Sequence, residues 1–185
     1  MTQEITPEAD SPPPRRWGIF LVWILVLGIL GVLGFSLMRT IQGPVSIGDE
    51  VPDFTLTTFS GEQIALGDLR GQVVVINFWA SWCKPCEQEA VVFEQAYQMY
   101  KDRGVVFLGV GYADTEREAR AYLVKYGITY PNGPDLGTRI SQAFRTSGVP
   151  ETYIVGPDGH LADVRIGPYA TLNEIINAVE GVLGY

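Results

Sequence analysis

The first strong pattern along the chain is a hydrophobic run without any charge. It covers 22 residues, from Trp17 to Met38. As a helix this run would be about 33 Å long, which matches the hydrocarbon thickness of a bilayer. Arg15 and Arg16 precede the run, and only Arg39 follows it closely. The excess of arginine on the N-terminal side predicts a single-pass transmembrane helix, with the N-terminus in the cytoplasm and the following domain outside.

A cleaved signal peptide is the alternative interpretation of this segment. Its apolar region usually has about 7–15 residues and ends at a cleavage site with small residues. Here the run is longer, and residues 35–38 (FSLM) contain no such site, so we favour an uncleaved anchor over residues 15–39. Residues 1–14 carry four prolines, three acids and no base, which predicts a disordered cytoplasmic tail. Residues 40–46 are expected to form a linker.

Residues 47–185 have the length of one domain, and strand patterns alternate there with helix patterns. Residues 73–78 (VVVINF) are a continuous apolar run, as in a strand buried on both faces. The prolines and glycine of residues 130–135 (YPNGPD) predict a loop. The order predicts an α/β domain with a central mixed sheet flanked by helices. The expected strands are 53–58, 63–66, 73–78, 105–111, 152–155 and 160–166, and the expected helices are 83–102, 115–126, 139–144 and 171–183.

Composition then narrows the class of function. The chain has 13 Lys+Arg against 21 Asp+Glu, a formal net charge of −8. Nucleic-acid-binding surfaces are basic, so no nucleic-acid partner is expected. A hydrophobic content of 46% is too high for a disordered chain. Two cysteines and one histidine are too few for a four-ligand zinc module, and no metal or other cofactor is predicted.

The candidate chemistry lies in residues 82–86 (WCKPC), which follow a predicted strand and open a predicted helix. Pro85 suits the first turn of a helix, where N–H groups have no intrahelical partner. Cys83 then lies at the helix N-terminus, where the helix dipole and neighbouring Lys84 favour its thiolate. Cys83 is therefore the candidate nucleophile. Cys86 lies one turn further on the same face and is the candidate resolving thiol of a redox-active disulfide.

Other interpretations of the cysteine pair are weaker. Zinc needs further ligands, and the sequence offers only His160, which we expect on the surface. A structural disulfide gains little stability from closing so short a loop. A chance pair is less plausible beside Trp82 and Pro85, so we predict a redox role.

The segments around the cysteines resemble the thioredoxin superfamily. Residues 78–86 (FWASWCKPC) resemble its active-site segment. Residues 51–56 (VPDFTL), residues 148–153 (GVPETY) and Glu89 narrow the resemblance to membrane-anchored thiol–disulfide interchange proteins of the TlpA/ResA/DsbE type, which serve cytochrome c maturation. The resemblance covers about residues 45–185, and it implies a thioredoxin-like fold.

The resemblance also implies roles for residues outside the cysteine pair. Pro150 matches the superfamily's cis-proline, which would place the backbone of Val149 beside Cys83, free to pair with an extended substrate peptide. An ordinary loop proline is the alternative. Trp82 is expected to flank the exposed sulfur and to contact a partner. Trp79 is expected in the core.

Glu89 matches an acidic residue that these proteins keep near the cysteine pair. A partly buried carboxylate with a raised pKa can carry protons to and from the thiols. An acid that merely stabilises the helix dipole is the alternative. Asn77 stands where thioredoxins usually have an aspartate, and it cannot titrate, which supports a role for Glu89. Glu151 is a second candidate acid or a structural one, and the sequence leaves both open.

Together these features predict a membrane-anchored, extracytoplasmic (periplasmic) thiol–disulfide oxidoreductase. By resemblance, its client is apocytochrome c or a similar exported protein, and a membrane thiol electron donor reduces it again. One alternative is a thiol peroxidase on the same fold. Peroxiredoxins have a threonine three residues before their nucleophile, where this chain has Ala80. The other alternative is a non-catalytic, tethered binding module for cytochrome c maturation partners.

Overall fold

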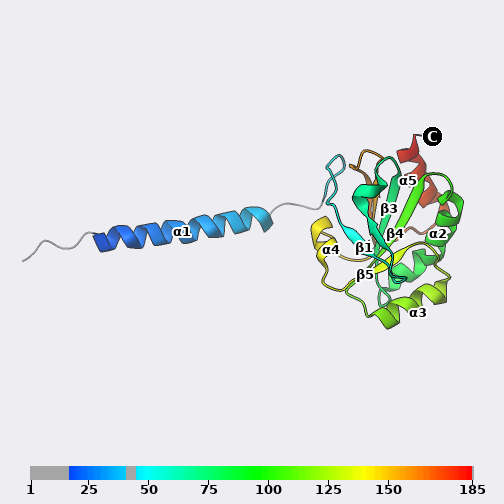
Figure 1. Ribbon diagram of the computed structural model, residues 1–185, viewed down its shortest axis with the longest axis horizontal. Helices are drawn as coiled ribbons and strands as arrows, with labels where there is room; N and C mark the ends of the chain where they lie inside the picture. The colour runs from blue at the N-terminus through cyan, green and yellow to red at the C-terminus, as the bar shows by residue number, and fades with distance from the viewer. Residues whose placement is uncertain (1–16, 41–44, 185) are drawn as a thin grey trace, which may run out of the picture. The chain divides into compact units, whose positions relative to one another are not determined.

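The computed structural model in Figure 1 describes residues 17–40 and 45–184. The chain divides into two units, Met1–Gln42 and Gly43–Tyr185, which are described separately. The expected tail over residues 1–14 lies outside the described residues. The same holds for Arg15 and Arg16 and for residues 41–44 of the expected linker.

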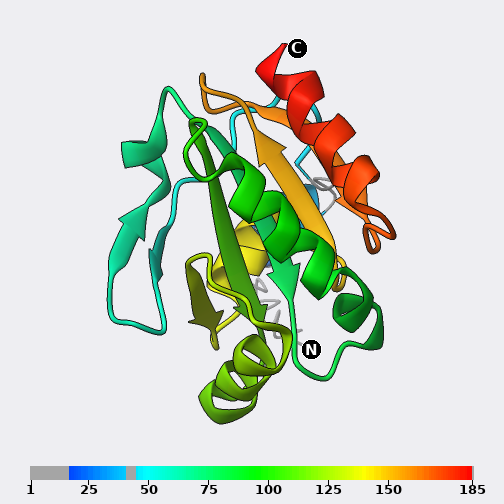
Figure 2. The same cartoon turned by 90° about the vertical axis from the view of Figure 1, so that its right-hand side faces the viewer.

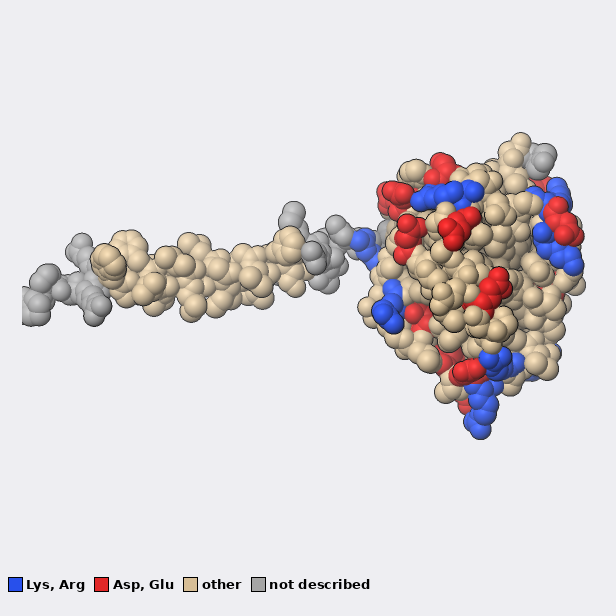
Figure 3. All heavy atoms as spheres, in the orientation of Figure 1, with Lys and Arg blue, Asp and Glu red and all other residues tan. Residues whose placement is uncertain are grey.

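The first unit contains helix α1 (Trp17–Thr40). Residues 17–36 of this helix are long and apolar enough to cross a membrane. The described side chains of α1 are uncharged and exposed, as a lipid-facing helix requires (Figure 3). A signal sequence meets the same criterion of length and composition. The helix is therefore a candidate membrane span, and its role as an anchor is taken up under the proposed function.

The second unit is built on a five-stranded mixed sheet in the order β5-β4-β3-β6-β7. Strands β3, β4 and β5 are parallel, whereas β6 and β7 run antiparallel to their neighbours. All seven residues of β3 are buried, as its continuous apolar sequence predicts. A separate antiparallel hairpin, β1–β2, precedes the sheet. The strands are β1 (Thr55–Thr57), β2 (Gln63–Ala65), β3 (Val73–Trp79), β4 (Val105–Tyr112), β5 (Asn132–Asp135), β6 (Glu151–Val155) and β7 (Leu161–Ile166).

Helices cover both faces of the sheet, which confirms the predicted α/β architecture. Alternate residues of β3 point to opposite faces. Val74, Ile76 and Phe78 share one core with the β1–β2 hairpin and α4, while Val73 and Val75 pack against α2 and α5. Figure 2 shows α2 and α5 side by side in front of the sheet. The helices are α2 (Lys84–Tyr100), α3 (Glu116–Tyr126), α4 (Arg139–Phe144) and α5 (Leu172–Leu183), with a short 3-10 helix over Leu66–Leu69.

Threonine side chains cap α3 and α5 at the residues where the sequence predicts these helices to begin. Thr115 is the N-cap of α3, and its hydroxyl accepts a hydrogen bond from the Glu118 N–H group. The same hydroxyl donates to the Glu118 carboxylate at 2.9 Å. Thr171 caps α5 in the same manner through the N–H group of Glu174. Each cap satisfies an N–H group that has no intrahelical partner.

The prediction of a loop over residues 130–135 is wrong. Asn132–Asp135 forms strand β5, which lies at the sheet edge and pairs with β4. An edge strand accepts proline, because one of its sides makes no ladder hydrogen bonds. Gly133 has a packing reason as well, since a side chain there would collide with the β1 backbone at Thr57. Local sequence favours a loop here, and long-range pairing overrides it.

Candidate active site at the start of helix α2

The cysteine pair lies where the central strand gives way to helix α2. Strand β3 ends at Trp79, and Cys83 is the N-cap residue of α2. The Cys83 sulfur accepts a hydrogen bond from the Cys86 N–H group at 3.2 Å. Pro85 occupies the first turn, as predicted. The two cysteines form a disulfide, so the structure represents the oxidised protein.

Both cysteines are buried, with 4% of Cys83 and none of Cys86 exposed. The expectation of an exposed Cys83 sulfur is therefore wrong. The loop before β6 accounts for this burial, because the carbonyl oxygen of Val149 lies 3.4 Å from the Cys83 sulfur. Trp82 is the exposed neighbour, and its ring meets the ring of Tyr112 edge-on with the centroids 6.4 Å apart. Trp79 is buried in the core, as predicted.

The peptide bond between Val149 and Pro150 is cis, as the resemblance implied. It ends the loop that connects α4 to β6. The carbonyl of Val149 thereby faces the sulfur at the N-terminus of α2, although 66 residues separate the two along the chain. The structure thus brings together three of the expected site residues: Cys83, Cys86 and Val149.

Glu151 holds this loop in place through hydrogen bonds. Its carboxylate is buried and accepts hydrogen bonds from the Ser147 N–H and hydroxyl groups, from the Gly148 N–H group and from the Tyr153 hydroxyl. Four donors on one buried carboxylate make a rigid anchor. Of the two roles that the sequence leaves open, this geometry favours the structural one, in which Glu151 holds the segment that carries Val149.

Glu89 is the buried acid nearest in sequence to the cysteine pair, one turn after Cys86 on α2. Its exposed fraction is 1%. Burial raises the pKa of Glu89 to about 7. Hydrogen bonds from the Asn77 side chain at 2.8 Å and from the Tyr169 N–H group at 3.0 Å oppose this rise, as does the charge of Arg165. A carboxylate that titrates near neutral pH can both take up and release a proton.

Asp114 is a site residue that the sequence analysis missed. It is buried at the end of β4, and its carboxylate accepts from the Ser81 N–H group at 2.6 Å and the Ser81 hydroxyl at 3.0 Å. A third hydrogen bond comes from the Thr115 N–H group. Asp114 thereby fastens the loop that leads from β3 to Cys83. In the sequence it resembles an ordinary acid before a helix cap, because its partner is 33 residues away.

Tyr122 of α3 is a second residue without a sequence signal. Its hydroxyl donates to the Cys86 carbonyl at 2.8 Å, and its ring stacks on Trp79 with the centroids 4.5 Å apart. The indole N–H group of Trp79 in turn donates to the Asn132 side chain at 2.8 Å. These contacts tie the first turn of α2 to α3 and β5. Among the described residues, no cluster of His, Cys, Asp or Glu is suited to hold a metal ion.

Known proteins resemble this chain in sequence and in fold. Residues 47–164 of the chain match the AhpC/TSA family. The chain belongs to this family. A relative of this AhpC/TSA protein is the thiol-disulfide oxidoreductase ResA of Bacillus cereus (strain ZK / E33L). The two are 32% identical over 147 residues, which are 78% of this chain and 85% of the relative. The thioredoxin-like protein YneN of Bacillus subtilis (strain 168) is 34% identical over 158 residues, 83% of this chain and 91% of YneN.

A solved structure supports the same assignment. The AhpC/TSA chain superposes on a Chlorobium tepidum protein assigned as the thiol:disulfide interchange protein DsbE with a TM-score of 0.70 and 26% identity. The match covers 76% of this chain and 99% of that protein. This AhpC/TSA protein is therefore a thiol–disulfide oxidoreductase of the ResA/DsbE type with a thioredoxin-like fold. The predicted fold, family resemblance and enzyme class are confirmed.

Proposed function

We propose that this protein is a membrane-anchored, extracytoplasmic reductase of protein disulfides that acts through Cys83. The observation that carries the proposal is the position of Cys83 as the N-cap residue of α2, facing the carbonyl of Val149. Unpaired N–H groups and the helix dipole stabilise a thiolate at this place. A backbone carbonyl beside the sulfur is suited to meet the backbone of an extended substrate.

The reaction transfers two electrons from the enzyme to the client. The Cys83 thiolate attacks one sulfur of the client disulfide, which breaks the S–S bond and releases the other client sulfur as a thiolate. The Cys86 thiolate then attacks the Cys83 sulfur of the mixed disulfide. This second step releases the remaining client sulfur and leaves the enzyme with its Cys83–Cys86 disulfide. Each client thiolate takes up one proton, so the client gains two electrons and two protons.

Glu89 is proposed to move a proton for the second step. In the reduced enzyme the buried Cys86 is a thiol, and it becomes a nucleophile only after losing its proton. Glu89 lies one helical turn from Cys86 and titrates near neutral pH, so its carboxylate is suited to accept this proton. Glu89 returns a proton when the disulfide is reduced again.

Three further residues are proposed to hold the client. The backbone of Val149, fixed by the cis bond to Pro150, pairs with an extended stretch of the client beside its disulfide. Trp82 has an exposed fraction of 58% and offers a flat apolar surface next to Cys83. These contacts orient the client sulfur without taking part in the electron transfer.

A trapping experiment tests the order of attack. A Cys86→Ala variant keeps the nucleophile but cannot resolve the mixed disulfide, so it should accumulate a covalent adduct with apocytochrome c. A Cys83→Ala variant is the matched control and should form none. Adducts through Cys86 alone would overturn the assignment of the nucleophile.

The redox potential of the pair tests the direction of the reaction. If the protein is a reductant, equilibration of its Cys83–Cys86 pair with glutathione should give a redox potential below about −200 mV. A value near −120 mV is that of a strong oxidant and would contradict the proposal. The measurement needs only the whole protein in detergent and a thiol-specific gel-shift reagent.

Anchoring by α1 and the identity of the partners complete the proposal. The helix is long enough to span a bilayer, and two arginines precede its uncharged run against one that follows the run closely. A reporter enzyme fused after Tyr185 should be active only outside the cytoplasm, and the protein should stay in the membrane at its full length.

We propose apocytochrome c as the client and a membrane thiol protein as the electron donor. A Cys83→Ser/Cys86→Ser variant that still matures cytochrome c fully would favour a binding module instead.

Slow turnover of hydrogen peroxide is expected, because Ala80 offers no hydroxyl group where peroxiredoxins have a threonine. A peroxide-consumption assay with the Cys86→Ala variant checks this expectation. Rapid consumption through Cys83 alone would favour the thiol peroxidase instead.

A further inference from the structure

Strand β1 pairs with β2 along one edge, and its other edge lies against β5 at Thr57 but pairs with no strand at Thr55. Its sheet contains only β1 and β2. The Leu66 N–H group donates to the Phe54 carbonyl, and the Thr58 N–H group donates to the Glu62 carbonyl. In an antiparallel pair such bonds occur at every second residue. The backbone N–H and C=O groups of Thr55 and Thr57 therefore point away from β2.

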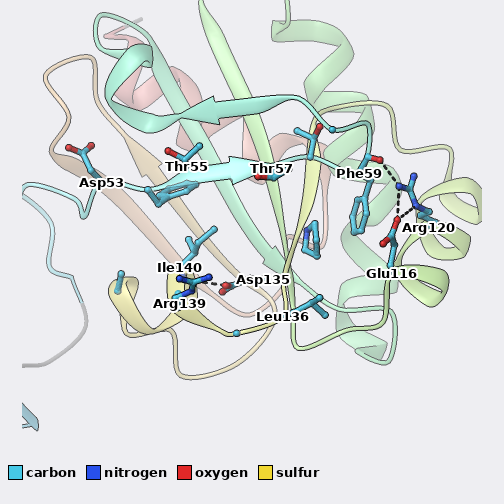
Figure 4. Close-up of a pocket in the computed structure, with 16 residues that line it drawn as sticks. Asp53, Thr55, Thr57, Phe59, Glu116, Arg120, Asp135, Leu136, Arg139 and Ile140 are labelled. Atoms are coloured by element: carbon cyan, nitrogen blue, oxygen red, sulfur yellow. Dashed lines mark hydrogen bonds and ion pairs between the residues drawn. The ribbon is translucent and has the colours of Figure 1, made fainter.

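This edge faces a groove of about 690 Å³. Figure 4 shows Thr55 and Thr57 of β1 on one wall and Ile140 of α4 opposite them. The groove ends where the Thr57 carbonyl meets Gly133 and where the Phe59 N–H group donates to the Asn132 carbonyl of β5. Its apolar lining includes Phe54, Phe59, Leu136, Ile140 and Ala143.

Three of the charged groups around the groove already have partners in the protein. Arg120 is bound to Glu116 and to the Phe59 carbonyl, as the dashed lines in Figure 4 show. Asp135 accepts hydrogen bonds from both the N–H and the hydroxyl groups of Ser141. What the groove offers is the open N–H and C=O groups of Thr55 beside apolar side chains. That chemistry suits an extended polypeptide better than a phosphate or a metal ion.

The groove also lies close to the cysteine pair. Asp135 of the groove is the register partner of Tyr112 on the neighbouring strand β4. The Tyr112 ring is in turn the edge-on neighbour of Trp82, which directly precedes Cys83. The groove is therefore separated from Trp82 by one strand spacing and one ring contact. A client bound at Cys83 needs only a few extended residues to reach the groove.

We propose that this groove takes up an extended segment of the client polypeptide, which pairs with the open end of the β1 edge at Thr55. The Thr55 N–H and C=O groups would bond to the client backbone, and an apolar client side chain would pack on Leu136, whose exposed fraction is 68%. The inference rests on the proposed function, because the segment belongs to the substrate of Cys83. It makes the protein selective for long, apolar clients over small disulfides.

The test compares two substrates of the whole, detergent-solubilised protein. One is glutathione disulfide, and the other is an apolar peptide of about 15 residues with an internal disulfide. Leu136→Glu places a charge in the groove and should lower kcat/KM for the peptide about tenfold, with no change for glutathione disulfide. Val124→Glu is the matched control, since Val124 is 83% exposed on α3 outside the groove. It should change neither value.

A second variant addresses the backbone directly. Thr55→Pro removes the N–H group to which the client backbone would bond. It should lower kcat/KM for the peptide and leave kcat/KM for glutathione disulfide unchanged. An unaltered peptide rate in Leu136→Glu, or an equal loss for both substrates, would overturn the proposal. Binding of the same peptide with serines in place of its cysteines isolates docking from chemistry. If the natural protein binds this peptide, Leu136→Glu abolishes the binding, and no disulfide is reduced, the proposed reaction is refuted and the docking stands. If the natural protein does not bind the peptide, the docking is refuted.

Discussion

Replacing Glu89 with glutamine should change how the stability of the protein depends on pH. The folded state holds the carboxyl group with a pKa of about 7, whereas its ordinary value is 4.5. The folded protein therefore binds this proton more tightly than the unfolded chain does. The stabilisation is fully present below pH 4.5 and is lost as the pH rises through 7. Glutamine does not titrate, so the variant lacks this contribution at every pH.

The size of the effect follows from the shift in pKa. Each pKa unit corresponds to about 1.4 kcal/mol, so a rise from 4.5 to about 7 gives about 3 kcal/mol. The free energy of unfolding of the natural protein, minus that of Glu89→Gln, should fall by about this amount between pH 4 and pH 8. Glutamine also turns an amide N–H₂ group toward Asn77 or Tyr169. That mismatch costs the same at each pH, so it shifts the difference by a constant and does not alter its change between pH 4 and pH 8.

Denaturant unfolding of the oxidised, detergent-solubilised protein, followed by near-UV circular dichroism, measures this quantity. Glu87→Gln is the matched control on the same helix. A hydrogen bond from Lys84 lowers the pKa of Glu87, so its contribution is present above pH 4.5 and is lost as the pH falls. The two variants should therefore differ in the sign of their pH dependence. A Glu89→Gln difference that stays constant within about 0.5 kcal/mol from pH 4 to pH 8 would refute the burial argument.

Other substitutions test the contacts around the site. Asp114→Ala leaves the Ser81 N–H group without its acceptor and should lower the free energy of unfolding by about 1–3 kcal/mol, whereas Ser81→Ala keeps that bond and should cost less. Tyr122→Phe removes the donor to the Cys86 carbonyl and should cost about 1 kcal/mol in denaturant unfolding. Gly133→Ala forces a side chain against the backbone of β1 and should lower the melting temperature. A melting temperature equal to that of the natural protein would contradict this packing.

Local sequence predicts the elements whose pattern is strong. The apolar run of residues 73–78 identifies the central strand, and Thr115 identifies the start of α3, because both signals are contained within a few residues. The cysteine pair is identified for the same reason, since a proline in the first helical turn fixes where α2 begins. The cis bond before Pro150 follows from the family resemblance and not from composition or spacing.

Contacts between distant segments are the part that the sequence does not contain in readable form. Strand β5 forms because β4 pairs with it, although its own residues favour a loop. Asp114 gains its role from Ser81, and Glu151 from a loop that closes on the cysteine pair. The burial of Cys83 has the same origin. The Val149 carbonyl that covers its sulfur follows 66 residues later in the sequence, after α2 and α3.

Because the Cys83 sulfur is covered, it should react faster with partners that bind the protein than with small molecules from solution. A partner that brings its own backbone to Val149 arrives already aligned with the disulfide, so it reaches the buried sulfur in a productive geometry. A small thiol or oxidant has no backbone to offer and must approach a sulfur with almost no open surface. Such shielding of the oxidised form would favour reduction of its disulfide by a thiol protein over reduction by small thiols.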